Sequence, residues 1–238
     1  MITLISVVTI ISGLVFLASG FYLFLSWKKK KELLLQIFGT FLLSIGIQMV
    51  FLTLGLVVFF NNPLMSNISW WIAHIFLLVG MGSLLLFPVS IKFPAKEKLA
   101  KKITISYLVI GGLILLLNLR KVELFTTSDN ILNWHVPGLS VAVIVVFASA
   151  VSLFSAYVFI SQSFGIENRL MKLRSIFLGL GILVFFIGGP MHNFVTNSAM
   201  AVAAASLSIL GVFLILAGIY TPIIFKQPPQ ENFPKTKL

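Results

Sequence analysis

The sequence has 238 residues, of which 59% are hydrophobic and 10% are charged, and its net charge is +11. A soluble domain has about 25% charged residues, so a chain this apolar cannot cover its own surface in water. Because the chain has no cysteine, disulfides, thiolate metal sites and cysteine nucleophiles are excluded. Nucleic-acid binding is not expected, because every Lys and Arg lies between apolar runs or in the C-terminal tail.

Apolar runs follow one another along the chain, each close to the roughly 20 residues that a membrane-spanning helix needs. The runs cover residues 2–27, 33–60, 68–91, 103–119, 138–162, 175–190 and 198–225. Helices are predicted, because backbone groups in lipid need internal partners and a barrel would show short alternating strands. The sequence therefore predicts an all-α membrane protein, a seven-transmembrane-helix bundle over residues 1–225, with residues 226–238 as a short disordered cytoplasmic tail.

The basic residues predict the orientation of the bundle. Of the 17 Lys and Arg residues, 15 lie in the first, third and fifth links or in the tail, and only Arg120 and Lys121 lie elsewhere. By the positive-inside rule, the N-terminus is outside and the C-terminus is cytoplasmic in the cell membrane. The first run lacks a preceding positive charge and is too long for a signal peptide, so we expect it to remain uncleaved.

Ionisable residues are missing from the middle of the predicted spans. The six acidic residues lie in links or in the tail: Glu32, Glu97, Glu123, Asp129, Glu167 and Glu231. Proton relays and ion-coupled transporters usually keep such groups within the membrane, so neither is expected. Paired carboxylates for acid/base catalysis are missing too, and we do not expect an enzyme.

Three histidines are the most suggestive polar residues. His74 lies 18 residues before Lys92 and His192 lies 18 residues after Arg174. At about 1.5 Å per helical residue, both would lie about 27 Å from the cytoplasmic edge of a core about 30 Å thick. His135, in the predicted outer loop, can fold over the same face, and tryptophans mark an outer aromatic belt there: Trp70, Trp71 and Trp134.

These side chains allow three interpretations. His74, His135 and His192 together could bind zinc or copper, although no pair has the tight spacing of a metal motif. Alternatively, they help to form a pocket for an organic ligand, whose predicted residues are His74, His192, Asn193, Trp70, Trp71 and His135. In the third interpretation each histidine only packs at the headgroup level. The sequence leaves the cofactor unknown.

Other polar and small residues predict helix packing. Gln48 is the deepest polar residue and is expected to form a hydrogen bond between helices. Small residues near the sixth and seventh runs predict that these two helices approach closely: Gly179, Gly181, Gly188, Gly189 and 201–205.

Two outer helix ends resemble each other. Residues 59–67 and 185–193 both run from two Phe residues to a Pro, a Met and an Asn, with one gap. Such a repeat would divide the chain into three helices, a connector and three helices, a plan found in small sugar transporters. Their Pro-Gln pair near the cytoplasmic helix ends is missing here. Chance recurrence of Phe-rich helix ends and Asn/Pro turns is the alternative explanation.

The stretch 169–193 combines basic residues with Phe177-Leu178-Gly179-Leu180-Gly181 and Gly188-Gly189-Pro190-Met191-His192-Asn193. With the predicted seven-helix layout, it resembles the membrane sensor regions of prokaryotic histidine kinases. The resemblance implies a ligand at the outer face and a signal passed inward. Such regions precede a coiled coil and a kinase domain, which we do not expect in this chain.

We therefore expect a non-enzymatic, sensor-like or ligand-binding protein whose partners are the lipid bilayer and a cytoplasmic or membrane protein. Two alternatives remain open. One is a facilitator of a small neutral solute with the three-one-three helix repeat. The other is a metal-binding membrane redox or accessory subunit.

Overall fold

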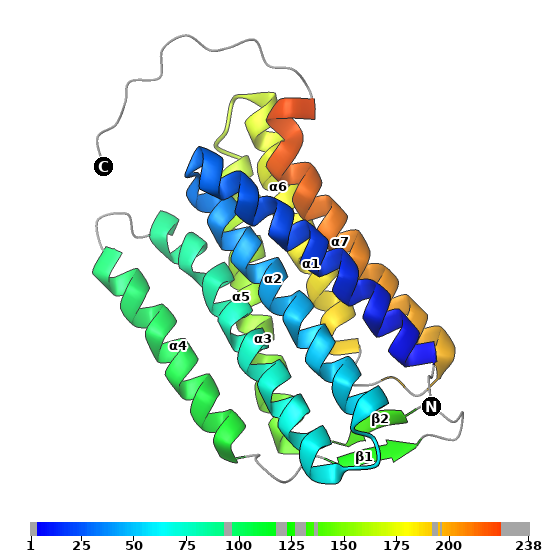
Figure 1. Ribbon diagram of the computed structural model, residues 1–238. Helices are drawn as coiled ribbons and strands as arrows, with labels where there is room; N and C mark the ends of the chain where they lie inside the picture. The colour runs from blue at the N-terminus through cyan, green and yellow to red at the C-terminus, as the bar shows by residue number, and fades with distance from the viewer. Residues whose placement is uncertain are drawn as a thin grey trace.

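The structure is a computed structural model, and it describes residues 4–92, 97–117, 123–126, 132–135, 138–191, 195 and 197–224. In these residues the chain forms a bundle of seven long helices with a small hairpin at one end (Figure 1). All seven helices are long and apolar enough to cross a membrane. The predicted all-α, seven-helix fold is confirmed. The tail, residues 226–238, lies outside the described residues, and its disorder stays a prediction.

The helix bounds follow the predicted runs closely. The described elements are α1 (Leu4–Lys30), α2 (Leu33–Thr53), a π-helical turn η1 (Leu54–Val58), α3 (Pro63–Lys92), α4 (Glu97–Leu117), β1 (Glu123–Thr126), β2 (Leu132–His135), α5 (Gly138–Ser163), α6 (Arg169–Met191) and α7 (Ser198–Ile224). The π-helical turn continues α2 to the end of the second predicted span. The antiparallel hairpin of β1 and β2 was not predicted.

Three helices begin earlier than the apolar runs predict. α3 begins at Pro63 rather than at residue 68, α4 begins at Glu97 rather than at residue 103, and α6 begins at Arg169 rather than at residue 175. Asn62 caps α3, because its Oδ1 accepts a hydrogen bond from the Met65 amide at 3.1 Å. Asn168 caps α6 in the same way. A side-chain oxygen at this position satisfies amides that the first helical turn leaves without partners, so α3 and α6 begin ahead of the apolar runs.

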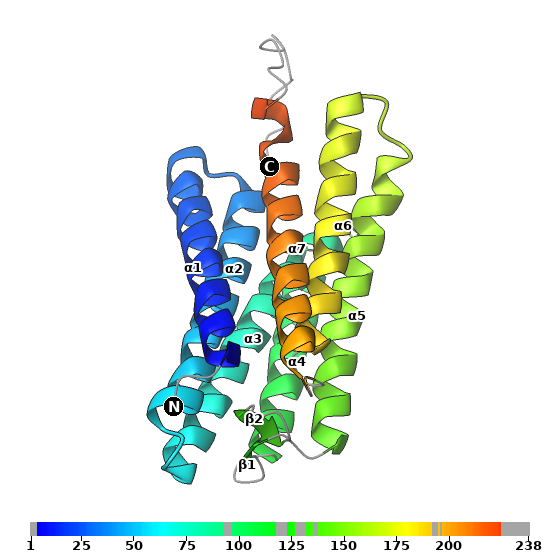
Figure 2. The same ribbon diagram turned by 90° about the vertical axis from the view of Figure 1, so that its right-hand side faces the viewer.

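The helices pack as two groups of three. α1, α2 and α3 are neighbours in chain order, as are α5, α6 and α7, and the groups meet where α1 contacts α7 and α3 contacts α5 (Figure 2). α4 lies at the edge of the bundle and packs chiefly on α3 (Figure 1). The described helices are thus arranged as three, one and three. The sequence repeat itself stays a prediction.

Small residues bring α6 and α7 into backbone contact. A Cβ atom on Gly211 of α7 would lie 2.5 Å from the backbone nitrogen of Phe185 on α6. Gly181 and Gly188 of α6 leave no room for a Cβ atom against α7 either, as the sequence predicts. Gly179 differs, because it faces α5. Close approach of this kind is the main source of helix association in lipid.

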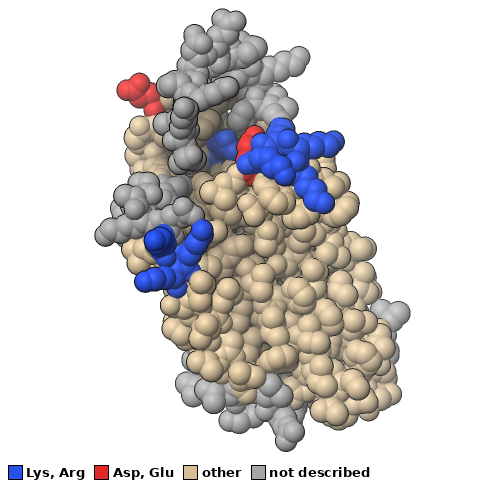
Figure 3. All heavy atoms as spheres, turned by 60° about the vertical axis from the view of Figure 1, so that its left-hand side comes forward, with Lys and Arg blue, Asp and Glu red and all other residues tan. Residues whose placement is uncertain are grey.

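Basic side chains of the described residues gather at the end of the bundle away from the hairpin (Figure 3). Lys28, Lys29 and Lys30 form the last turn of α1, and Lys98 and Arg169 lie in the first turns of α4 and α6. The hairpin follows α4 at the opposite end. Charge therefore divides the bundle into a basic end and a hairpin end.

Candidate functional site

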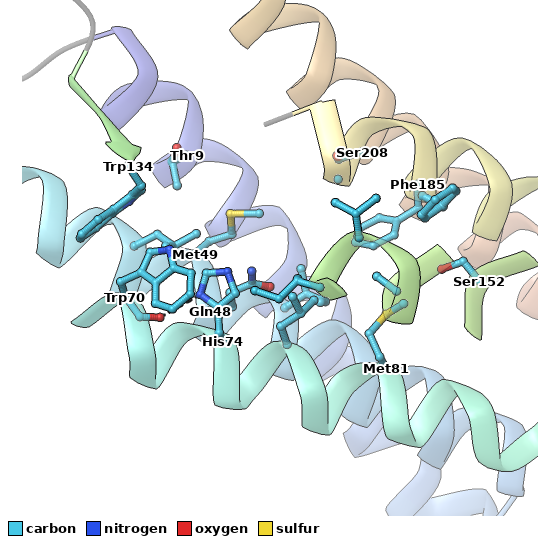
Figure 4. Close-up of a pocket in the computed structure, with 18 of the residues that line it drawn as sticks. Thr9, Gln48, Met49, Trp70, His74, Met81, Trp134, Ser152, Phe185 and Ser208 are labelled. Atoms are coloured by element: carbon cyan, nitrogen blue, oxygen red, sulfur yellow. Dashed lines mark hydrogen bonds between the residues drawn. The ribbon is translucent and has the colours of Figure 1, made fainter. Parts of the chain in front are cut away.

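A cavity of about 130 Å³ lies between the two groups of three helices and extends from the hairpin toward the middle of the bundle (Figure 4). Its wall takes residues from every described helix except α4, and from β2. One residue from each of these six long helices and from β2 shows its extent: Thr9, Gln48, His74, Trp134, Ser152, Phe185 and Ser208. The cavity therefore lies where the α1–α3 group meets the α5–α7 group.

Trp134 of β2 covers the cavity at the hairpin end. Its ring lies against the π-helical turn, where a Cβ atom on Gly55 would be only 2.6 Å from Trp134 Cζ2. Only glycine leaves room for this ring. Trp134 also packs with Leu56 and Trp70, which line the cavity beside it. The sequence placed Trp134 in an aromatic belt, whereas the structure uses it to close the cavity.

His74 of α3 presents one ring nitrogen to the cavity side of the bundle. Its Nδ1 lies 2.8 Å from the backbone oxygen of Trp70. Because a carbonyl oxygen only accepts, Nδ1 must donate, and in neutral His74 the lone pair is then on Nε2. Nε2 has no hydrogen-bond partner among the described residues. The ring is 7% exposed and stacks on the Trp70 ring with 3.8 Å between centroids.

Gln48 of α2 is the second polar group in the wall. It is 8% exposed, lines the cavity, and makes no hydrogen bond with any described residue. The predicted bond between helices is therefore not formed with any described residue, because a space separates Gln48 from the facing helices. Figure 4 shows the Gln48 amide and the His74 ring both reaching into this space. A buried amide without a partner costs about 1–3 kcal/mol.

The rest of the cavity is largely apolar. Met49, Met81 and Phe185 contribute to the wall, and Ser208 already donates a hydrogen bond to the Ala204 carbonyl at 3.0 Å. None of the described lining residues is acidic, Lys or Arg. A dry cavity of about 150 Å³ is known to bind benzene, so this one has room for a small ring. Its chemistry suits an uncharged molecule with one or two hydrogen-bonding groups.

The predicted site residues fall into three groups. His74 and Trp70 line the cavity, and Trp70 is buried rather than in an aromatic belt, because the hairpin covers it. Trp71 is partly buried nearby and does not line the cavity. His192 and Asn193 lie outside the described residues, as does the side chain of His135.

The metal interpretation depends on residues that the structure does not describe. No three His, Asp or Glu side chains gather within the described residues. His74 alone of the predicted ligands is placed, and its Nε2 is the atom that a metal would take. Zinc or copper held by His74, His135 and His192 therefore stays a prediction.

Gln48 and His74 are unusual in the sequence, but the sequence does not show that they line the same cavity. Their 26-residue separation gives no periodic signal, and the cavity exists only because α2 and α3 pack beside the second group of helices.

No protein-family model matches the chain, and no curated protein matches it in sequence. Function is therefore inferred from the cavity and its side chains.

Proposed function

We propose that this protein is a multi-pass protein of the cell membrane that binds a small uncharged molecule in the cavity. It acts as a sensor-like binding protein without catalysis of its own. A cytoplasmic or membrane partner protein passes the signal on. The resemblance of residues 169–193 to the sensor regions of histidine kinases supports this role.

The orientation is part of the proposal. The hairpin end, with the start of α1, faces the outside, and the basic end faces the cytoplasm. The clustering of described Lys and Arg residues at the far end supports this assignment (Figure 3). A ligand bound beneath the hairpin then lies in the outer half of the membrane.

One observation carries the proposal: two polar side chains, each more than nine-tenths buried, line the same cavity, and neither the Gln48 amide nor Nε2 of His74 has a hydrogen-bond partner among the described residues. Nε2 of His74 accepts, so it needs an O–H or N–H donor. The Gln48 amide both donates and accepts. A single hydroxyl group on the ligand can bond to both, which offsets the cost of burying them.

Phenol and benzene are a matched pair of probes for this chemistry. Full-length protein in lipid nanodiscs is titrated with each compound, and tryptophan fluorescence reports binding because Trp70 and Trp134 line the cavity. Affinities are expressed as concentrations in the bilayer. We expect phenol to bind about five- to tenfold more tightly than benzene, the gain of about one hydrogen bond.

Substitutions in the cavity test whether the preference for phenol over benzene arises there. In Gln48→Leu and His74→Phe, phenol loses its advantage over benzene, because each change removes one hydrogen-bonding group at similar volume. Gln162→Leu, at the end of α5, is the matched control and keeps the preference. Phenol that does not bind, or a double variant that still prefers phenol, contradicts the proposal.

A metal site is a second candidate, favoured by the unpartnered Nε2 of His74. Elemental analysis of gently purified full-length protein distinguishes the two. Close to one zinc or copper ion per chain, lost in His74→Phe, supports the metal site and reopens the question of redox or enzyme activity. A metal-free protein that binds phenol supports the organic ligand.

A facilitator is favoured by the position of the cavity between the two groups of three helices. Proteoliposomes placed in hypertonic glycerol test this function, since a facilitator lets the solute in and the vesicles swell again. Swelling faster than in empty liposomes supports transport, and equal rates contradict transport of glycerol.

A further inference from the structure

A second hollow lies on the outside of the bundle, between α3, α4 and α5. This groove has a volume of about 440 Å³. Val146 and Ala150 form its α5 side, and both are exposed on the surface that faces lipid in a membrane. Every described residue that lines the groove is apolar except Tyr107. The groove therefore suits an aliphatic chain.

A narrow neck lies between the groove and the cavity. The neck has a volume of about 20 Å³, and His74, Leu77, Ile144 and Ala148 line both it and the cavity. At its other end Tyr107 and Phe147 line both the neck and the groove.

The walls of the neck can yield. Most are Leu, Ile and Phe side chains, which move without breaking hydrogen bonds. Rotamer changes of these side chains would therefore widen the neck without breaking a hydrogen bond between them.

Tyr107 of α4 marks the point where the neck meets the groove. Its side chain is 9% exposed, and its hydroxyl makes no hydrogen bond with any described residue. The ring packs on Phe147 of α5 with 5.7 Å between centroids. The Gln48 amide, Nε2 of His74 and the Tyr107 hydroxyl are thus three buried polar groups that have no hydrogen-bond partner among the described residues and that line neighbouring spaces. Polar groups at the inner end and an apolar groove at the outer end match a molecule with a head and a tail.

We propose that the ligand is an uncharged amphiphile, with a hydroxyl-bearing head in the cavity and an aliphatic tail in the groove. It reaches the cavity sideways from the bilayer, between α4 and α5. The inference rests on the proposed function, because the head occupies the cavity already described. It adds the class of ligand and the route. The described residues of α4 and α5 contact each other little, which favours entry on this side of the bundle.

Phenol and 4-octylphenol test the tail. Both are titrated against full-length protein in nanodiscs by tryptophan fluorescence, with affinities expressed as concentrations in the bilayer so that partitioning cancels. We expect 4-octylphenol to bind about tenfold more tightly than phenol on this scale, through packing in the groove. Ala150→Phe fills the groove and removes this gain while the affinity for phenol is unchanged. Val109→Phe, on the exposed surface of α4 outside the groove, is the control and keeps the gain.

The outcomes separate the two proposals. Phenol that binds while the octyl tail adds nothing, or a tail gain that survives in Ala150→Phe, overturns the groove and leaves the proposed function standing. Failure of both compounds to bind overturns the proposed function. A tail gain lost only in Ala150→Phe supports the lateral route.

Discussion

Two helix pairs of the same bundle differ in how they meet. α6 and α7 touch through their backbones at Gly181, Gly188 and Gly211, whereas α4 and α5 are separated by the groove and meet at Tyr107 and Phe147. Both pairs are strongly apolar, so hydrophobicity does not explain the difference. Helices in lipid are held by close packing rather than by water, so small residues make a tight pair and aromatic rings keep a pair apart. The comparison predicts which side of the bundle tolerates change.

A larger side chain gives the strongest test of this difference. Ala204 of α7 is completely buried, whereas Ala150 of α5 is exposed at the groove. We expect Ala204→Leu to destabilise the bundle by about 1–3 kcal/mol, because the added carbons have no space. Ala150→Leu should leave stability unchanged. The measurement is the temperature at which half of the protein is lost from its size-exclusion peak after heating. Equal losses for the two variants would show that the pairs do not differ.

The next largest loss of stability is expected when a single methyl group is added between α6 and α7. In Gly211→Ala the new Cβ atom meets backbone atoms of Phe185, which cannot rotate away, so α6 and α7 must move apart. We expect a loss of about 1–2 kcal/mol, equivalent to a few degrees in the same heating measurement. Gly112→Ala on α4 is the control, since nothing lies within 4 Å of its new Cβ atom. A control that loses as much stability as Gly211→Ala contradicts the explanation.

The smallest expected effect on stability is at the turn between α5 and α6, which connects the widely spaced α4–α5 pair to the closely packed α6–α7 pair. Asn168 lies between α5 and α6, and its Oδ1 accepts hydrogen bonds from the amides of Leu170 at 3.0 Å and Met171 at 3.3 Å. We expect Asn168→Ala to cost about 1 kcal/mol by removing this cap. Asn168→Ser keeps a side-chain oxygen and should restore most of the loss. Identical unfolding temperatures for the Ala and Ser variants would rule out the cap as the cause.

The seven helices could be predicted from the sequence because membrane spans are recognised by their length and hydrophobicity. It missed the starts of α3 and α6, since counting apolar residues ignores a capping Asn62 or Asn168. It missed the start of α4 as well, because the first turns of that helix carry charged residues. It also missed the hairpin, because two four-residue strands are too short to show alternation. Local hydrogen bonding and tertiary packing, rather than hydropathy, decide these features.

The candidate site was only half predictable. Depth along the helix marked His74 and Gln48 as unusual, because polar residues are rare inside spans. The sequence could not show that both would face one cavity, nor that Trp134 would close it. Such facts depend on how helices rotate about their axes, and the described helices are too uniformly apolar for a polar face to fix that rotation.

The hydrogen bond between His74 Nδ1 and the Trp70 carbonyl has a mechanical consequence. It ties the imidazole to the backbone of its own helix one turn away, and the Trp70 ring supports it from the side. These two contacts restrain rotation of the ring. A donor bonded to Nε2 would therefore act on the position of α3 rather than on a freely rotating side chain. α3 reaches Lys92 at the basic end of the bundle. The imidazole is thus held in a fixed position on a helix that is long and apolar enough to cross a membrane.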